Sequence, residues 1–377
     1  MNKNLPEILF PIYFWGFIYL KPFIVDNPLS TLILTIFVSL ISAIFVLDRI
    51  LHKKEIITKW FVFITVVLLL FYIDTNLRQD NPIGQRYFYE FIFSAYIPSI
   101  IFSQIKTPRL FLKYFSLLGV LAILLFGLDG VNDYPLYGDY MTFGFNLVMP
   151  SFFASALALI YFKKNIAILP LLFCFYNLIL YSNRGALLSS FIYLFVLVIL
   201  TKENRKKVIG ATSIYLFIII LLIVNMESLL GKLLIYAETY GINSYGLNQF
   251  ATYFNGGDNN QLFSGRLQIW DNAINLIKSN FILGTGIGSF ETIYGVYSHN
   301  LILDFFIFHG FIGFVIYCYL LYKSIITLQQ KNSQIRIFIL TILLLMVPKL
   351  LLSSYFVSDM AFWCFISFGF KQIKHAN

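Results

Sequence analysis

SHNLILDFFIFHGFIGFVIYCYLL, residues 298–321, decides the fold class of this chain. Asp304 is its single acidic residue, and it contains neither lysine nor arginine. A helix of about 20 mostly apolar residues crosses the hydrocarbon core of a bilayer, which is about 30 Å thick. The stretch therefore predicts a membrane helix, with His299 and Asn300 at the point where the chain enters the membrane.

Similar apolar runs recur along the whole chain. Of its 377 residues 59% are hydrophobic and only 12% are charged, against about 45–50% and 25% in soluble proteins. About twelve membrane helices are expected, at 7–24, 28–48, 58–73, 87–104, 110–128, 142–162, 165–182, 185–201, 208–226, 298–321, 336–351 and 353–371. The expected fold is all-α, with residues 1–377 forming a single integral membrane domain. Aromatic residues, 19% of the chain, suit lipid-facing helices and interfacial belts.

The basic residues orient this bundle, because cytoplasmic loops of membrane proteins are enriched in lysine and arginine. With the amino terminus in the cytoplasm, about 19 of the 27 basic residues fall in or beside cytoplasmic segments. Both termini are thus expected in the cytoplasm of a bacterium, with the chain in its inner membrane. The formal net charge of +9 then reflects topology, and no nucleic-acid partner is expected.

The cysteines and acidic residues give no metal signature. Cys174, Cys318 and Cys364 all lie inside apolar runs, without the spacing of a zinc site, and are interpreted as packing residues. No acidic cluster suited to a divalent cation is apparent in the outer segments. The sequence therefore predicts neither a metal nor another cofactor.

One connection, residues 227–297, is far longer than an ordinary loop and is expected on the outer face. Its start, residues 226–240, is amphipathic and predicts a helix on the membrane surface. Residues 264–279 predict a second helix, with Ser264 as its cap and apolar side chains at three- and four-residue spacing. Between these helices, NGGDNN at 255–260 indicates a turn or a mobile tip.

Three basic residues on the outer side are candidates for chemistry. Arg184 lies between two apolar runs, where it is either functional or a snorkelling anchor. Arg266 lies in the first turn of the predicted outer helix, where a cation is mildly unfavourable; the alternative is a solvated surface arginine. His299 is the one histidine expected on the outer face, and its usual pKa suits proton transfer near neutrality, although a lone histidine is more often structural.

Charged residues inside membrane helices are costly and are functional candidates by default. They are Glu90, Asp304, Lys349 and Asp359. Buried ion pairs or hydrogen bonds between helices are an equally good interpretation, and a proton-coupled transporter would also place such residues there. The run GTGIGSF at 284–290 does not fit a nucleotide-binding loop and predicts a tight turn with close backbone approach.

Taken in order, the motifs resemble the O-antigen polymerase and O-antigen ligase superfamily over about residues 180–320. They are Ser182-Asn183-Arg184-Gly185-Ala186, Gly265-Arg266 with Trp270 and Ala273, Gly284 to Phe290, and His299-Asn300 with Asp304 and Gly310-Phe311-Ile312-Gly313. The resemblance implies a membrane glycosyltransferase with a GT-C-like helical fold. Such an enzyme transfers a glycan from undecaprenyl diphosphate to a sugar hydroxyl, without a nucleotide sugar or a metal.

The family's two arginines and histidine fall here on Arg184, Arg266 and His299, the first two as diphosphate ligands and the third as the catalytic residue. Asn300 and Asp304 are expected to support them. The favoured activity is that of a polymerase, which passes the growing glycan to an incoming lipid-linked repeat unit. The alternatives are a ligase that uses lipid A-core as acceptor, and a polysaccharide flippase or transporter. The expected partners are the undecaprenyl-diphosphate-linked oligosaccharide, membrane lipid and a chain-length regulator protein.

The chemistry of these residues fits that implication independently. A diphosphate leaving group calls for multidentate cationic donors, which arginine supplies better than lysine. Attack by a hydroxyl benefits from a base of near-neutral pKa. Asp129, Asp133 and Asp139 share an outer loop but lack the diagnostic spacing of a glycosidase pair. Hydrolysis is therefore not expected.

Overall fold

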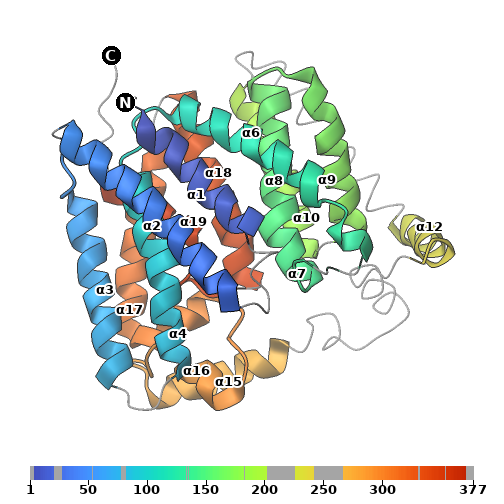
Figure 1. The fold of residues 1–377 in the computed structure, drawn as a ribbon. Helices are drawn as coiled ribbons and strands as arrows, with labels where there is room; N and C mark the ends of the chain where they lie inside the picture. Colours follow the sequence, from blue (N-terminus) through green and yellow to red (C-terminus); the bar gives the residue numbers. More distant parts are fainter. Residues whose placement is uncertain are drawn as a thin grey trace. The chain divides into compact units, whose positions relative to one another are not determined.

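In the part of the chain that the structure, a computed structural model, describes, every element of regular secondary structure is a helix (Figure 1). That part comprises residues 4–20, 28–52, 54–77, 82–132, 134, 136–181, 183–201, 226–241, 266–329, 332–352 and 354–370. The all-α expectation is confirmed there. Three predicted features lie outside the described residues: residues 208–225 of the expected span 208–226, the tip 255–260 and the cap Ser264.

Seven described helices are long and apolar enough to cross a membrane. They are Leu32–Leu51, Lys59–Asn76, Pro108–Val131, Tyr140–Tyr161, Arg184–Thr201, Leu301–Gln329 and Ser333–Leu351. Three further apolar helices are shorter: Leu5–Leu20, Asn165–Leu180 and Met360–Phe370. The chain is therefore a multi-pass membrane protein with seven candidate spans among the described residues, and the total of about twelve stays a prediction.

The chain divides into two compact units, Met1–Phe14 with Ile33–Phe111 and Arg266–Asn377, and Trp15–Leu32 with Leu112–Gly265. Helices wholly or mainly in the first unit are α1 (Leu5–Leu20), α2 (Pro28–Leu51), α3 (Lys59–Leu77), α4 (Pro82–Phe91), α5 (Ile97–Ser103), α15 (Arg266–Ser279), α16 (Ser289–Tyr294), α17 (Leu301–Ile326), α18 (Ser333–Leu352) and α19 (Met360–Ser367). Those of the second are α6 (Pro108–Phe126), α7 (Tyr140–Thr142), α8 (Met149–Ala156), α9 (Ile168–Leu180), α10 (Arg184–Thr201) and α12 (Met226–Thr239). The predicted helices at 226–240 and 264–279 are thus found as α12 and α15.

A break in α17 is the feature that most directly shapes the first unit. Gly310 has φ 61° and ψ −160°, which no helix accommodates, so the backbone groups around it need other partners. The loop before α16 supplies them: Thr285 N donates to Ile307 O (2.6 Å) and Phe311 N donates to Phe281 O (2.8 Å). Non-helical backbone at membrane depth is tolerated only where protein satisfies its hydrogen bonds.

The two glycine-containing motifs therefore meet at this break. A Cβ on Gly310 would lie 2.3 Å from Ile282 O, and one on Gly284 would lie 2.5 Å from Gly310 N. The predicted tight turn with close backbone approach is confirmed. The turn allows the backbone of the loop to pack directly against the backbone of α17 at its break.

Helix α19 is shorter than the predicted span 353–371. Residues 354–359 are not helical, and Asp359 caps α19 by accepting from Phe362 N (2.8 Å). The other Asp359 oxygen lies 3.1 Å from Lys349 Nζ. For Lys349 and Asp359 the ion-pair interpretation is therefore confirmed, because the buried carboxylate has both a cation and a helix end to compensate it.

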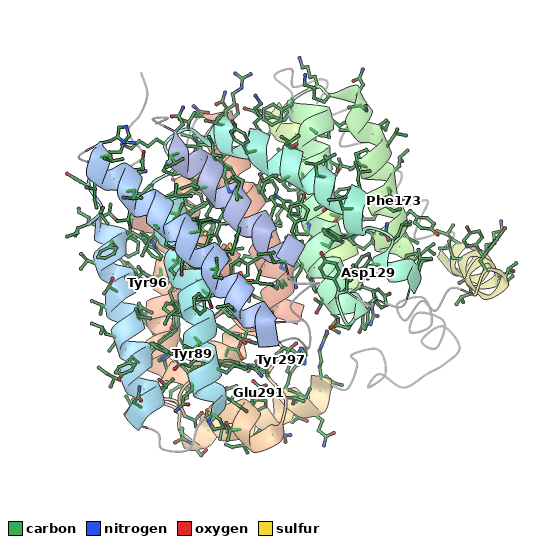
Figure 2. All side chains as sticks on the ribbon, viewed as in Figure 1. Tyr89, Tyr96, Asp129, Phe173, Glu291 and Tyr297 are labelled. Atoms are coloured by element: carbon green, nitrogen blue, oxygen red, sulfur yellow. The ribbon has the colours of Figure 1, made fainter. Side chains whose placement is uncertain are left out.

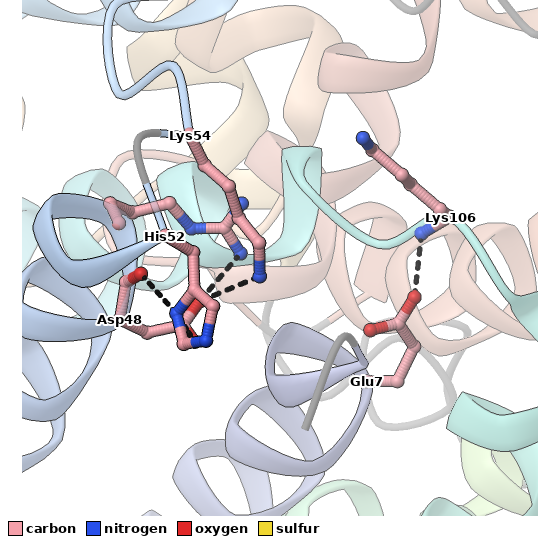
Figure 3. A network of polar contacts seen from close by, with 6 residues as sticks. Glu7, Asp48, His52, Lys54 and Lys106 are labelled. Atoms are coloured by element: carbon pink, nitrogen blue, oxygen red, sulfur yellow. Dashed lines mark hydrogen bonds and ion pairs between the residues drawn. The ribbon is translucent and has the colours of Figure 1, made fainter. Parts of the chain in front are cut away.

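A second polar network consists of two groups of contacts, one at the end of α2 and the other between α1 and the connection before α6 (Figure 3). Buried Asp48 lies 3.1 Å from Lys54 Nζ and 3.2 Å from His52 Nδ1. Glu7 Oε1 accepts from the backbone N–H groups of Lys106 (2.8 Å) and Thr107 (2.9 Å). The network compensates carboxylates that would be costly if unpaired, and the predicted topology places it at the cytoplasmic side.

The second unit is built around a continuous helical run from Tyr140 to Tyr161. It includes two π-helical segments, η4 (Phe143–Val148) and η5 (Leu157–Tyr161). α9 and α10 pack against it, and the Phe153 ring stacks on the Tyr193 ring of α10 at 3.9 Å. This packing fixes α10, whose first residue is Arg184.

Candidate functional site

The candidate site lies where the chain enters α17. Asn300 is the N-cap residue of this helix, and its side-chain oxygen accepts from Ile302 N (3.0 Å) and Leu303 N (3.3 Å). The preceding residue, His299, has φ 55°. A left-handed conformation is uncommon for a residue with a side chain and marks positions that the surrounding structure holds in place.

Ser298 is the residue through which that turn is held. Its carbonyl accepts from Trp270 Nε1 of α15 (3.1 Å), and its hydroxyl lies 2.5 Å from Asp304 Oδ1. The backbone N–H of Asn300 donates to the same hydroxyl oxygen (3.2 Å). Asp304, only 1% exposed, thus fastens the first turn of α17 to the residue before His299.

The His299 imidazole is kept neutral by its surroundings. Burial and, to a smaller extent, the positive charge of Arg266 together lower its pKa from 6.5 to about 4. Within the described part of the chain, Nδ1 is buried and makes no hydrogen bond. At neutral pH the ring therefore carries one nitrogen that can accept a proton, and the tautomer decides which one.

Arg266 is the first residue of α15 and is partly buried. Helix α15 packs against α17 through a face that includes the fully buried Ala273. A cation at a helix N-terminus meets the positive end of the macrodipole. The position is therefore mildly unfavourable for the free arginine and becomes favourable when an anion binds.

Arg184 occupies the same place in its own helix, in the second unit. It is the first residue of α10, and Asn183 before it acts as a cap by accepting from Ala186 N (2.8 Å). The Asn183 amide also donates to Met141 O (3.4 Å). Both candidate arginines thus stand at helix N-termini, where the positive end of the helix macrodipole favours anions.

Of the predicted site residues, Arg266, His299, Asn300 and Asp304 meet at one loop–helix junction of the first unit. Arg184 belongs to the second unit. Sequence reasoning did not single out Tyr297, whose ring lies 4.0 Å from that of His299. Its proximity to His299 in the sequence was a local signal, but its other aromatic contact, with Tyr355, could come only from the fold.

In the ranges that the structure describes, no group of three or more His, Cys, Asp or Glu side chains is arranged to hold a metal ion. Metal independence itself remains a prediction.

The fold and these residues define a multi-pass membrane protein with a polar site at the end of a broken membrane helix. Residues 169–318 match the family model described as O-Antigen ligase, a family that includes both polymerases and ligases. The matched segment is less than half of the chain and contains Arg184, Arg266 and His299. The chain has no match among curated proteins or among solved structures. The family match suggests a membrane glycosyl-transfer enzyme.

Proposed function

We propose that this chain is an O-antigen polymerase of the bacterial inner membrane. It transfers a growing glycan from undecaprenyl diphosphate to an incoming lipid-linked repeat unit on the outer face. One observation carries the proposal: the segment that matches the family holds a neutral histidine beside an arginine at a membrane-entry turn. That pair suits proton abstraction next to an anionic leaving group.

In this proposal the arginines bind the diphosphate of the donor. A guanidinium group presents a planar set of donors that fits phosphate oxygens. The first backbone N–H groups of α15 add donors of the same polarity beside Arg266. Arg266 and Arg184 therefore replace the divalent cation that many glycosyltransferases use, and the enzyme acts without metal or nucleotide sugar.

His299 acts as the general base. One imidazole nitrogen takes the proton of the acceptor hydroxyl as its oxygen bonds to the anomeric carbon. The bond between that carbon and the diphosphate oxygen breaks, and the electron pair leaves with undecaprenyl diphosphate. The imidazolium then returns its proton to solvent. Asp304 and Asn300 support the reaction by fixing the turn that presents His299.

Deletion of the chain's gene in its host, followed by electrophoresis of the surface glycan, tests the activity. Loss of a polymerase leaves lipid A-core capped by a single repeat unit. Loss of a ligase, the second candidate because the matched family carries that description, removes all capped material and leaves carrier-linked glycan. Single carrier-linked units facing the cytoplasm would instead identify a flippase and contradict the proposal.

Further expectations follow from the same assignment. The loop 227–297 and the site face outward, both termini face the cytoplasm, and a chain-length regulator binds the protein in the membrane. Polymerisation by purified protein should persist in EDTA. A strict requirement for a divalent cation, restored by adding the cation back, would contradict the metal-free mechanism.

A further inference from the structure

Arg86 of α4 is held by two carboxylates from different elements. Its Nε lies 3.3 Å from Glu90 Oε1, one turn further along α4, and its Nη2 lies 3.6 Å from Glu291 Oε1 on α16. Helix α16 lies beside the end of α4 (Figure 1). Since two negative charges surround this one cation, the group is a poor diphosphate ligand, although Arg86 is 54% exposed.

The remaining oxygens of the two carboxylates accept hydrogen bonds from two tyrosines. Tyr87 donates to Glu291 Oε2, and Tyr355, from the turn before α19, donates to Glu90 Oε2. The two tyrosine rings stack on each other, with centroids 4.2 Å apart and an interplanar angle of 19°. The contacts therefore form a closed ring that begins and ends at the Arg86 guanidinium.

This ring extends to the candidate base through aromatic contacts. The Tyr355 ring meets the Tyr297 ring edge-on, with centroids 5.6 Å apart. Tyr297 in turn packs on the His299 imidazole at 4.0 Å. Glu291 and Tyr297 lie near the same end of the helices in Figure 2. All of these residues belong to the first unit.

We propose that Arg86 is a positioning residue for His299, acting through Tyr355 and Tyr297. The inference rests on the proposed function, in which His299 is the base. His299 lies in a left-handed turn, and the Ser298–Asp304 contact fixes the turn on one side of the imidazole. The series of ring contacts from Tyr355 through Tyr297 to His299, called here the aromatic ladder, fixes the other side. Arg86 contributes because it holds Glu90, which accepts the hydrogen bond of the Tyr355 hydroxyl. Effective base catalysis requires the imidazole to be held in a fixed orientation toward the acceptor hydroxyl.

Carbethoxylation of histidine by diethyl pyrocarbonate tests the ladder without relying on activity. Full-length protein in native membranes is treated at pH 7, and each histidine peptide is quantified by mass spectrometry. Arg86→Gln, Tyr355→Phe and Tyr297→Leu should each raise the modification rate of His299 several-fold, since the ring gains mobility and access. His52 in its separate network should react at the wild-type rate.

Two substitutions serve as matched controls. Tyr89→Phe changes a 60% exposed tyrosine on the same helix as Tyr87, and Lys278→Gln removes an exposed cation at the end of α15. Both should leave the His299 rate unchanged. An unchanged His299 rate in Tyr355→Phe and Tyr297→Leu would overturn the proposal, and so would an equal rise at His52, because that result indicates general loosening of the fold.

Activity gives the second readout. A misplacement of about 1 Å can cost on the order of 10²-fold in rate, so Arg86→Gln should lower kcat by up to that factor with little change in KM. In a His299→Ala background the same substitution should have no further effect, because Arg86 acts through the imidazole. An additional large loss in that background would overturn the positioning role.

The two readouts also separate this inference from the proposed function. If His299→Ala keeps a normal glycan ladder, the base assignment fails, whatever the labelling shows. If His299→Ala is inactive but the ladder variants leave both kcat and labelling unchanged, the positioning role alone fails.

Discussion

Replacement of Gly310 by alanine should strongly disrupt the structure around the candidate site. The added Cβ would lie 2.3 Å from Ile282 O and 2.4 Å from Ile282 C. Because these are backbone atoms, relief requires the 281–286 segment to move away from α17. The backbone conformation at φ 61° and ψ −160° is a glycine region that costs other residues about 1–3 kcal/mol.

The movement also weakens the hydrogen bonds that join the two segments. These include Thr285 N to Ile307 O and Phe311 N to Phe281 O, each with a net value of about 0.5–1.5 kcal/mol. Together with the backbone strain, the expected loss is about 2–6 kcal/mol. That is a large fraction of the about 5–15 kcal/mol that typically stabilises a folded protein.

Thermal unfolding of detergent-solubilised protein, followed by fluorescence-detected size exclusion, measures the effect. Gly295→Ala is the matched control, because Gly295 also has a positive φ of 73° but nothing within 4 Å of its added Cβ. It should cost only the backbone strain, about 1 kcal/mol. Equal shifts in apparent Tm for the two variants would refute the steric account of the break in α17.

Three further predictions concern the site. His299→Gln should abolish the long-chain glycan ladder at normal protein abundance, since glutamine forms hydrogen bonds but cannot act as a base at neutral pH; a fully retained ladder would exclude that role. Arg184→Ala and Arg266→Ala should each lower the rate by about 10²–10³-fold, by analogy with lost oxyanion donors, and lysine should restore it only in part; wild-type rates in both alanine variants would remove these arginines from the site. Carbethoxylation of His299 should titrate near the pKa of about 4, and Arg266→Gln should raise that midpoint. A carbethoxylation midpoint at or above pH 6.5 would contradict the burial argument. Because the pKa of His299 in the folded protein lies below the usual 6.5, the unfolded chain binds a proton more readily. The contribution of His299 to folding stability is therefore complete above pH 6.5 and is lost as the pH falls toward 4.

Hydropathy and charge were enough to predict the all-helical membrane architecture. Residues 298–321 predicted a membrane helix, and the helix begins at Leu301 with Asn300 as its cap. This prediction was reliable because an uninterrupted stretch of about 20 apolar residues is typical of a helix that spans a bilayer. The same reasoning overextended the last span, because Tyr355 to Asp359 are mostly apolar in composition yet form a turn that Asp359 and Lys349 stabilise.

The candidate site was predicted only as far as local motifs reach. His299, Arg266 and Arg184 could be chosen because polar residues stood out at the ends of apolar runs. The contacts of Arg86, Glu291, Tyr355 and Tyr297 join segments far apart in sequence, and no spacing rule connects them. Glu90 was a candidate because its charge is costly in the membrane. Its i,i+4 spacing to Arg86 is a local signal, but its contact with Tyr355, 265 residues away, could come only from the structure.

The electrostatics of His299 also bear on the order of events in the proposed reaction. In the free site, burial and the Arg266 charge disfavour the imidazolium, so the ring is available but only weakly basic. A diphosphate bound by Arg266 supplies negative charge beside the same ring, which offsets the effect of the arginine and favours the imidazolium. The base therefore becomes stronger when the donor arrives. The acceptor hydroxyl is then deprotonated mainly in the complex that also contains the bound donor glycan. Arg266, which binds the leaving group, therefore also sets the basicity of His299.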